Sequence, residues 1–228
     1  MRDSASTVLA RTDLHDQVYA SLKEALATRK LAPGEKLSLQ ELATAYGVSR
    51  SPVQQALTRL VTEGLVEVKP HLGHFVKPLT VASVCEAYDV REALELWVAD
   101  HTVGRVAPGE LAELRRLMER TLVMLERRRI RDYDGYFATN QAFHDFLVGL
   151  AGNELMRASY RRLSVNALMA RVLTGHGDRQ NNLAEEHEEI VDAFEAGDRR
   201  RAAVAIRAHV ATGKELAVAA IEQAGGVL

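Results

Sequence analysis

The order of apolar and polar residues from Ser49 to Val76 predicts a helix followed by a two-stranded hairpin. Apolar residues recur at i, i+3, i+4 and i+7, the spacing of one helix face, at Val53, Ala56, Leu57 and Leu60. The remaining face is polar and carries no acid; its residues are Arg50, Ser51, Gln54, Gln55, Thr58 and Arg59. Such side chains hydrogen-bond to base edges and phosphates, so the pattern predicts a helix that can enter a DNA groove.

The residues after this helix predict a wing. Gly64 ends the helix, and two short strands are expected over 66–69 and 74–77. Pro70 and Gly73 stand between the strands, where a turn is required. The helix and the hairpin together form the second half of a winged DNA-binding unit.

Two helices are predicted before this segment. Residues 14–29 repeat apolar positions on one face, and the Leu31–Gly34 segment, with its proline and glycine, breaks that helix. Ser38 and Glu41 have the spacing of a capping box and start a short helix that ends at Tyr46 and Gly47. A short helix, a glycine-containing turn and a second helix form a helix-turn-helix.

The rest of the chain has a helical pattern with short breaks at Gly, Pro or Asn. Six helices are expected, over 80–106, 108–129, 132–150, 153–173, 179–196 and 198–223. The predicted fold is mainly α: a winged helix-turn-helix with a small two-stranded wing, then an antiparallel all-helical bundle. The expected domain limits are a tail over 1–12, a DNA-binding domain over 13–77, a linker over 78–80 and a helical domain over 81–228.

Composition adds little to this division. The net charge is −2, and residues 1–79 hold ten Lys and Arg against eight Asp and Glu, a weak basic bias. The single cysteine, Cys85, excludes an internal disulfide and suits a reducing compartment. There is no apolar run that could span a bilayer and no signal-peptide core, so a cytoplasmic, nucleoid-associated protein is expected.

Three histidines of the bundle form a candidate metal site. His187 lies ten residues before Gly197 and His209 eleven after Asp198, so a fold-back at this turn places both rings at nearly one height. His144 lies in the middle of a third helix, and Asn140 shares its face one turn earlier. Three imidazoles and one oxygen can hold a divalent metal. The plainer alternative is that each histidine is simply hydrogen-bonded or solvated, as we expect for His15, His71, His74, His101 and His176. Of these, His71 and His74 lie in the wing and could contact phosphate.

The sequence motifs give little support for an enzymatic function. The sequence EEHEEI lacks the HExxH pattern of zinc proteases, and there is no Gly-rich phosphate loop and no GxSxG. Glu186 and Glu188 point about 100° away from His187 around the helix, so neither is placed as a general base over a shared metal. The prediction is therefore a protein that is not an enzyme.

The chain resembles the GntR family of bacterial transcription regulators. The matching segment is LAPGEKLSLQELATAYGVSRSPVQQALTRLVTEGLVEVKPHLGHFV, over 31–76. The helical remainder resembles the FCD ligand-binding domain of the FadR-type branch, through YDVREALE (88–95), NQAFHDFL (140–147), EEHEEIVDAFEAGD (185–198) and AIRAHV (205–210).

The resemblance implies a homodimer that binds a palindromic double-stranded DNA operator. It places Arg50 and Arg59 on DNA and Gly73 at the wing tip. Two positions depart from the family pattern. Gln54 stands where arginine is usual, which changes the base that can be read, and His74 occupies a wing position that is often small or polar.

The resemblance also implies a metal, expected to be zinc or nickel, held by His144, His187 and His209 with Asn140 as the oxygen ligand. Arg91 resembles the arginine that faces the carboxylate of the effector. Its alternative is a surface salt bridge with Glu95 at i+4, worth a few tenths of a kcal/mol.

The resulting expectation is a transcription regulator, a repressor, whose operator affinity is controlled by a small carboxylate metabolite bound near the metal. Three alternatives remain open at this stage: a sensor of the metal ion itself, a purely structural metal site and, more distantly, a metal-dependent enzyme. Neither the effector, the operator nor the regulated genes follow from the sequence.

Overall fold

The computed structural model of the 228-residue chain describes residues 12–27, 30–126, 129–130, 132–163 and 183–228. Backbone contacts divide it into two compact units, one up to Leu79 together with Leu228, and the other Thr80–Val227. Leu228 joins the first unit because its backbone exchanges hydrogen bonds of 2.7 and 2.9 Å with Leu79.

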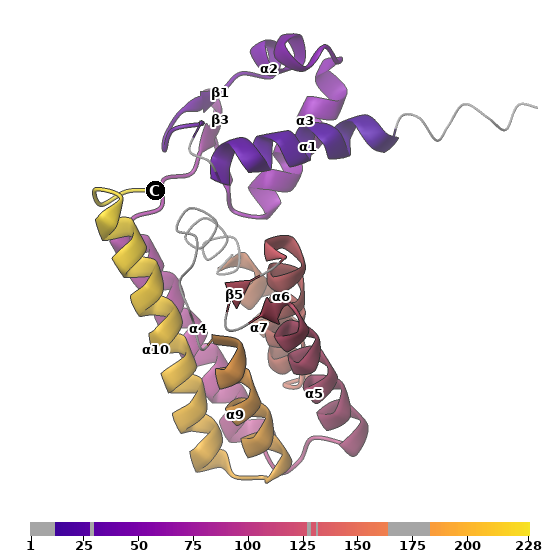
Figure 1. The fold of residues 1–228 in the computed structure, drawn as a ribbon, viewed down its shortest axis with the longest axis vertical. Coiled ribbons are helices and arrows are strands. Elements are labelled where there is room, and N and C mark those ends of the chain that lie inside the picture. Colours follow the sequence, from indigo (N-terminus) through magenta and orange to yellow (C-terminus); the bar gives the residue numbers. More distant parts are fainter. Residues whose placement is uncertain (1–11, 28–29, 127–128, 131, 164–182) are drawn as a thin grey trace, which may run out of the picture. The chain divides into compact units, whose positions relative to one another are not determined.

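The described residues of the N-terminal unit form three helices and a small sheet (Figure 1). In chain order the elements are α1 (Thr12–Ala27), β1 (Lys36–Leu37), α2 (Leu39–Tyr46), α3 (Arg50–Thr62), β2 (Val66–Lys69) and β3 (Gly73–Val76). The predicted helix-turn-helix and wing are present. The wing was expected to have two strands, but the sheet has three, in the antiparallel order β1-β3-β2.

Local signals account for the helix ends. The Ser38 hydroxyl accepts a 3.3 Å hydrogen bond from the Glu41 amide, as predicted for the start of α2, and α2 ends at Gly47, whose φ is 65°. Ser49 is the N-cap of α3 without a side-chain bond, and Gly64 follows the helix with a φ of 72°. The apolar stripe predicted for α3 is fully buried and packs against α1.

The helical unit contains six described helices and one hairpin (Figure 1). The helices are α4 (Val81–Thr102), α5 (Pro108–Val123), α6 (Tyr133–Gly149), α7 (Glu154–Arg162), α9 (Leu183–Glu195) and α10 (Arg199–Gln223). The prediction of an exclusively helical pattern here was wrong at one point. The helix expected over 108–129 ends at Val123, and β4 (Leu125–Glu126) pairs with β5 (Arg129–Ile130) before α6 begins.

Parts of the predicted elements lie outside the described residues. These are most of the tail expected over 1–12, residues 28–29 of the helix expected over 14–29 and residues 127–128 of the one expected over 108–129. The end of the helix expected over 153–173, the start of the one expected over 179–196, and His176 also lie outside them.

Helices α4 and α10 pack against each other in opposite directions along most of their length. Three hydrogen bonds from α10 side chains show the direction: Lys214 to Asp89 at 2.6 Å, Arg207 to Glu92 at 2.7 Å, and Arg199 to the Val103 carbonyl at 3.3 Å. The chain turns back at Gly197 between α9 and α10, so these two helices pack against each other, and α9 also packs on α5. The bundle is therefore antiparallel where α4, α9 and α10 meet.

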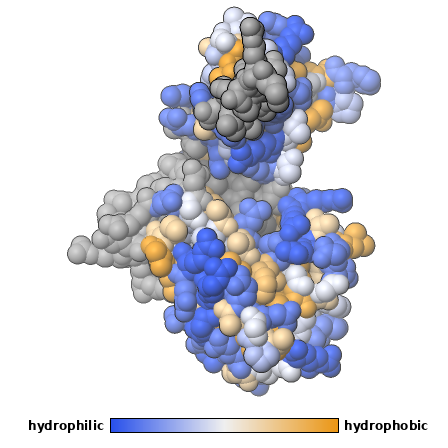
Figure 2. All heavy atoms as spheres, turned by 90° about the vertical axis from the view of Figure 1, so that its right-hand side faces the viewer, coloured by the Kyte–Doolittle hydropathy of each residue, from blue (hydrophilic) through white to orange (hydrophobic). Residues whose placement is uncertain are grey.

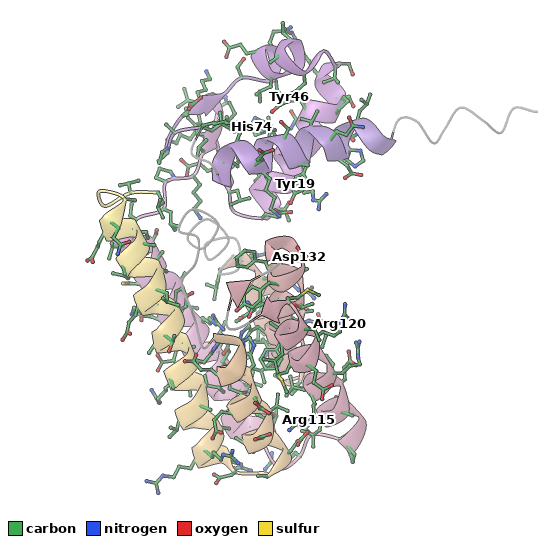
Figure 3. All side chains as sticks on the ribbon, in the orientation of Figure 1. Tyr19, Tyr46, His74, Arg115, Arg120 and Asp132 are labelled. Atoms are coloured by element: carbon green, nitrogen blue, oxygen red, sulfur yellow. The ribbon has the colours of Figure 1, made fainter. Side chains whose placement is uncertain are left out.

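Ion pairs connect neighbouring helices at the surface of this bundle. Arg115 of α5, labelled in Figure 3, donates to Asp192 at 2.6 Å and to Glu195 at 2.6 and 2.7 Å, both on α9. On the face drawn in Figure 2, hydrophobic residues form small groups separated by hydrophilic ones. Among the described residues, none of the helices combines the length and apolarity needed to cross a bilayer.

Candidate metal centre and nucleic-acid interface

The three candidate histidines meet inside the helical unit. His144 comes from α6, His187 from α9 and His209 from α10, and all three are buried, with 0–2% of each residue exposed. Their Nε2 atoms lie 3.0 Å apart for His144 and His187, and 3.2 Å apart for each of the other two pairs. Side chains far apart in sequence thus present one nitrogen each to a common point.

This triangle of nitrogens fits a metal ion. With metal–nitrogen bonds of about 2.1 Å, neighbouring nitrogens lie about 3.0 Å apart in an octahedral arrangement and about 3.4 Å apart in a tetrahedral one. The observed edges of 3.0 and 3.2 Å fall within the range that these two arrangements span. Three nitrogens on one face of an octahedron leave the other positions for oxygen ligands.

Carboxylates contact the outer nitrogens of two of these rings. His144 Nδ1 lies 3.1 Å from Glu95 Oε1, and His209 Nδ1 lies 3.2 Å from Glu186 Oε2. Thr212 donates to the other oxygen of Glu186 at 2.8 Å. A carboxylate at the outer nitrogen fixes the ring and leaves Nε2 free as the ligand atom. Glu186 was weighed in the sequence only as a general base for His187, whereas in the structure it contacts His209 on the neighbouring helix.

The environment keeps the three imidazoles neutral. Burial, followed by the charge of Arg91, lowers the pKa of His144 below its ordinary value. Burial and the neighbouring rings lower the pKa of His187 well below that value, and burial with Arg91 does the same to the pKa of His209. Neutral imidazole is the form that binds a metal.

Asn140, the fourth expected ligand, is buried on α6 one turn before His144, with 8% of the residue exposed. Phe143 lies between them in sequence, and its ring packs at 4.4 Å, centroid to centroid, against the ring of His187. The side of α6 that faces α9 therefore combines the candidate ligands with an apolar ring.

Arg91 and Glu95 form a buried pair beside the histidines. Arg91 is 3% exposed and Glu95 is 0% exposed, and Arg91 Nε donates to Glu95 Oε1 at 2.9 Å. The alternative of a surface salt bridge is therefore wrong, because the face of α4 that carries both residues is turned into the bundle. Arg91 Nη2 lies 2.7 Å from His144 Nε2, so the guanidinium borders the candidate metal centre.

Glu95 is a site residue that the sequence analysis did not select. Besides Arg91 and His144 it contacts Tyr160 of α7, whose hydroxyl donates to Oε1 at 3.0 Å. Burial alone would raise the pKa of Glu95, but the charge of Arg91 and the hydrogen bond from His144 hold that pKa well below its ordinary value. The i, i+4 spacing from Arg91 was the available signal, and it is equally typical of an exposed pair.

The polar face of α3 is exposed, as a DNA-reading helix requires. The residues predicted for it, Arg50, Ser51, Gln54, Gln55, Thr58 and Arg59, are all exposed. Arg50 donates through Nε to Gln40 Oε1 of α2 at 2.7 Å, and its Nη2 contacts the same oxygen. Gln54 Nε2 donates to Thr58 Oγ1 at 3.3 Å.

Arg59 differs from its neighbours on α3 because it also holds α1. Its guanidinium lies over the ring of Tyr19, labelled in Figure 3, and pairs at 3.3 Å with both Asp16 and Glu63. The Tyr19 hydroxyl in turn donates to Glu63 at 2.8 Å. The position that the sequence assigns to DNA is thus also a packing contact within the N-terminal unit.

The wing residues lie on β3, the central strand of the sheet. Gly73 begins the strand with a φ of 105°, a conformation that side-chain-bearing residues rarely adopt, after His71 with a φ of 60°. His74, labelled in Figure 3, is half-buried and lies opposite Val68 on β2 and Leu37 on β1. The exposed end of the wing is the turn formed by Pro70, His71 and Leu72.

Comparison with known proteins assigns each of the two units to a known family of domains. The pattern of the bacterial regulatory proteins of the gntR family matches residues 14–76, and that of the FCD domain matches residues 86–212. An HTH-type transcriptional regulator in an unstable DNA locus of Streptomyces ambofaciens is 35% identical over 201 residues, which are 88% of this chain and 83% of the relative. The chain belongs to the GntR family, with an FCD domain. It is therefore a transcription regulator.

One further relative and one solved structure are also similar to the chain. The transcriptional repressor RspR of Escherichia coli K12 is 25% identical over 186 residues, which are 81% of this chain and 80% of the relative. The solved structure of E. coli McbR/YncC superposes with a TM-score of 0.64 at 23% identity, covering 90% of this chain and 97% of that one. The second similarity shows the fold of the regulator, a winged helix-turn-helix with a helical FCD domain.

Proposed function

We propose that this regulator binds a palindromic operator as a homodimer and represses transcription, and that a small organic acid bound in the FCD domain controls operator affinity. The observation that carries the proposal is the buried Arg91 guanidinium 2.7 Å from a nitrogen of the His144–His187–His209 triangle. A buried cation beside three neutral imidazoles is suited to an anion that bridges an arginine and a metal.

A divalent metal, zinc or nickel, would be held by His144, His187 and His209, with the Asn140 side-chain oxygen as a further ligand. When bound, the metal supplies a Lewis-acidic position for a carboxylate oxygen of the effector. Glu95 and Glu186 orient two of the rings through their outer nitrogens. The chain's own contribution is a rigid set of neutral ligands in a buried site.

Arg91 would bind the carboxylate of the acid. Its guanidinium stays charged because burial is outweighed by the neighbouring Glu95, which raises the pKa of Arg91 above its ordinary value. A planar guanidinium offers paired donors that match the two oxygens of a carboxylate.

DNA would be read by the exposed face of α3. In this proposal Arg50 and Arg59 contact phosphates or guanines, while Ser51, Gln54, Gln55 and Thr58 contact base edges or the backbone. Gly73 and His74 belong to the wing, which contacts the neighbouring groove or phosphate. Gln54 favours adenine over the guanine that an arginine at this position would select.

Helix α4 would couple the two activities. It begins at Val81, directly after the linker 78–80, and carries Arg91 almost three turns later. An acid bound to Arg91 therefore acts on the helix to which the DNA-binding unit is joined. Control requires that the acid bind more tightly to one arrangement of the dimer than to the other, and that this arrangement change the half-site spacing.

The test uses full-length protein loaded with metal. A screen of organic and sugar acids by thermal shift finds the acids that bind, because a ligand of the native state stabilises it by mass action. The acids that bind are then titrated into an operator-binding assay. Arg91→Ala should abolish both responses, whereas Arg105→Ala, an exposed arginine beyond the end of α4, should leave them unchanged.

A metal sensor is the second candidate, and the meeting of the three histidine nitrogens favours it, since this ligand set could bind an ion without any acid. Titrating zinc or nickel against operator binding without any acid separates the two. Operator affinity that follows metal concentration alone indicates a sensor. A metal that raises thermal stability but changes neither operator binding nor the acid response is structural.

A further inference from the structure

The two carboxylate oxygens of Glu95 have very different surroundings. Oε1 receives three donors: Arg91 Nε at 2.9 Å, the Tyr160 hydroxyl at 3.0 Å and His144 Nδ1 at 3.1 Å. Oε2 is buried and has no hydrogen-bond partner among the described residues. A buried charged acceptor without a partner is costly and calls for a donor that the described residues do not supply there.

A second unpartnered polar atom lies on the same face of α4. The hydroxyl of Tyr88, a residue that is 0% exposed, also has no hydrogen-bond partner among the described residues. Tyr88, Arg91 and Glu95 stand at i, i+3 and i+7, and the Arg91 guanidinium carbon lies 5.6 Å from the centroid of the Tyr88 ring. Two orphaned polar atoms therefore flank the arginine proposed to bind the acid.

The facing helix approaches Tyr88 closely at a glycine. Gly213 of α10 lies opposite Tyr88, and a Cβ atom at Gly213 would approach the Tyr88 hydroxyl to 3.0 Å. Gly213 stands one turn after His209, on the side of α10 that carries the candidate ligand. The orphaned atoms, the arginine and the histidines thus belong to one buried polar region between α4 and α10.

We propose that Glu95 is a specificity-determining residue, and that its free oxygen accepts a hydrogen bond from a hydroxyl or ammonium group of the bound acid. The ligand class is then a hydroxy- or amino-substituted carboxylate. The inference rests on the proposed function, in which Arg91 takes the carboxylate of that ligand.

Electrostatics explains why an unsubstituted acid fits less well. A carboxylate at Arg91 stands close to the carboxylate of Glu95, and two like charges in a buried site repel each other. A hydroxyl or ammonium group beside the ligand's carboxylate places a hydrogen atom between the two charges. The same group fills the acceptor that otherwise stays unpaired, which is the situation in which binding sites discriminate most strongly.

The first experiment compares acids that differ at one carbon. Metal-replete full-length protein is titrated calorimetrically with propionate, lactate and alanine, with succinate, malate and aspartate, and with glutarate, 2-hydroxyglutarate and glutamate. In the series whose length fits, the hydroxy or amino member should bind at least about tenfold more tightly than the unsubstituted member.

The second experiment changes the acceptor. In Glu95→Gln the three donors that converge on Oε1 hold the amide oxygen at that position, so the amide nitrogen replaces the free oxygen. The variant should lose affinity for the amino member about tenfold or more, and for the hydroxy member less, because a hydroxyl can also accept. The unsubstituted acid should bind as well as before or better. Glu86→Gln, at an exposed position of α4, is the matched control, and metal content is measured for each variant.

The outcomes separate the two proposals. If none of the nine acids binds, the proposed function is wrong for these acids and the inference fails with it. If acids bind through Arg91 but the substituted and unsubstituted members bind equally, the proposed function stands and the inference is overturned. Because the comparison within each series uses the wild-type protein, it remains decisive even if Glu95→Gln does not fold.

Discussion

The guanidinium carbon of Arg59 lies 3.7 Å from the centroid of the Tyr19 ring, so the recognition helix and the first helix of the N-terminal unit meet through a residue that is also proposed to contact DNA. Asp16 and Glu63 complete the arrangement at 3.3 Å each. Arg50, at the other end of α3, is bonded only to Gln40 in the described contacts. Arg59 therefore contributes to the packing of α1 on α3, whereas the bonds described for Arg50 reach only the neighbouring helix α2.

Replacing these arginines should separate DNA binding from stability. Arg59→Ala should weaken operator binding and also lower the free energy of unfolding by about 1 kcal/mol, because a cation–π contact and two exposed ion pairs are lost. Arg50→Ala should weaken operator binding with an unfolding free energy within about 0.5 kcal/mol of wild type. Gel-shift titration at physiological salt and urea unfolding measure the two quantities. Unchanged affinity in either variant would remove that arginine from the interface.

Gln54 should determine one base of the operator. Gln54→Arg should shift the preferred base at one position of each half-site from adenine to guanine, with a discrimination of about 1–3 kcal/mol. Selection from a randomised operator library, run with both proteins, measures the shift. Gln55→Arg is the matched comparison on the same helix, and identical selected sequences for wild type and Gln54→Arg would show that this side chain does not read a base.

Removing two of the three histidines should remove the metal. His187→Gln combined with His209→Gln should lower the metal content from about one ion per chain to about none, since one imidazole and one amide oxygen do not form a stable site. Elemental analysis after gel filtration gives the stoichiometry, and circular dichroism checks the fold. His101→Gln, an exposed position at the end of α4, should retain full occupancy. A double variant that keeps its metal would show that the site lies elsewhere.

The histidine cluster should make stability depend on pH in one direction. All three pKa values are lowered in the folded protein, so below about pH 6.5 the unfolded chain binds protons that the folded chain does not. The stability of metal-depleted protein should be constant above that pH and fall by about 1 kcal/mol or more per unit below it. Urea midpoints at pH 7.5, 6.5 and 5.5 test this, and a flat profile over that range would contradict it. His187→Gln should reduce the slope.

The contact between Gly213 and Tyr88 should limit what α10 can carry. Gly213→Ala should destabilise the protein by about 1–3 kcal/mol, because the new methyl group meets the Tyr88 ring and hydroxyl at 3.0 Å and outweighs the helical preference of alanine. Tyr88→Phe removes the hydroxyl, so it should recover part of that loss when combined with Gly213→Ala. Thermal unfolding of the two single variants and the double variant completes the cycle. Additive effects would show that the two residues do not interact.

The sequence predicted the features that depend on local periodicity. The α3 stripe is buried because its i, i+3, i+4 spacing admits one packing face, and the capping residue Ser38 specifies a helix start by itself. The meeting of His187 and His209 followed from their distances to a single glycine turn. Two-residue strands such as β1 and β4 escaped prediction, since two residues carry no periodicity.

Glu95 escaped prediction for a different reason. Its partner Tyr160 lies 65 positions away in the sequence and His144 lies on another helix, so no local pattern connects them. Arg91 and Glu95 at i, i+4 are consistent with both a surface pair and a buried one. Burial of the pair depends on how α4, α6 and α7 pack, which the sequence pattern alone does not fix.

The spacing of His187 and His209 on either side of the turn at Gly197 determines the geometry of the candidate metal site. His187 and His209 present their nitrogens to one point only while the number of residues between them is kept. One residue inserted into α10 before His209 would rotate every later position of the helix by about 100° and advance it by about 1.5 Å. His209 would then leave the triangle, and Gly213 would no longer face Tyr88. The register of α10 after the Gly197 turn thus determines whether the proposed binding site can form in the bundle.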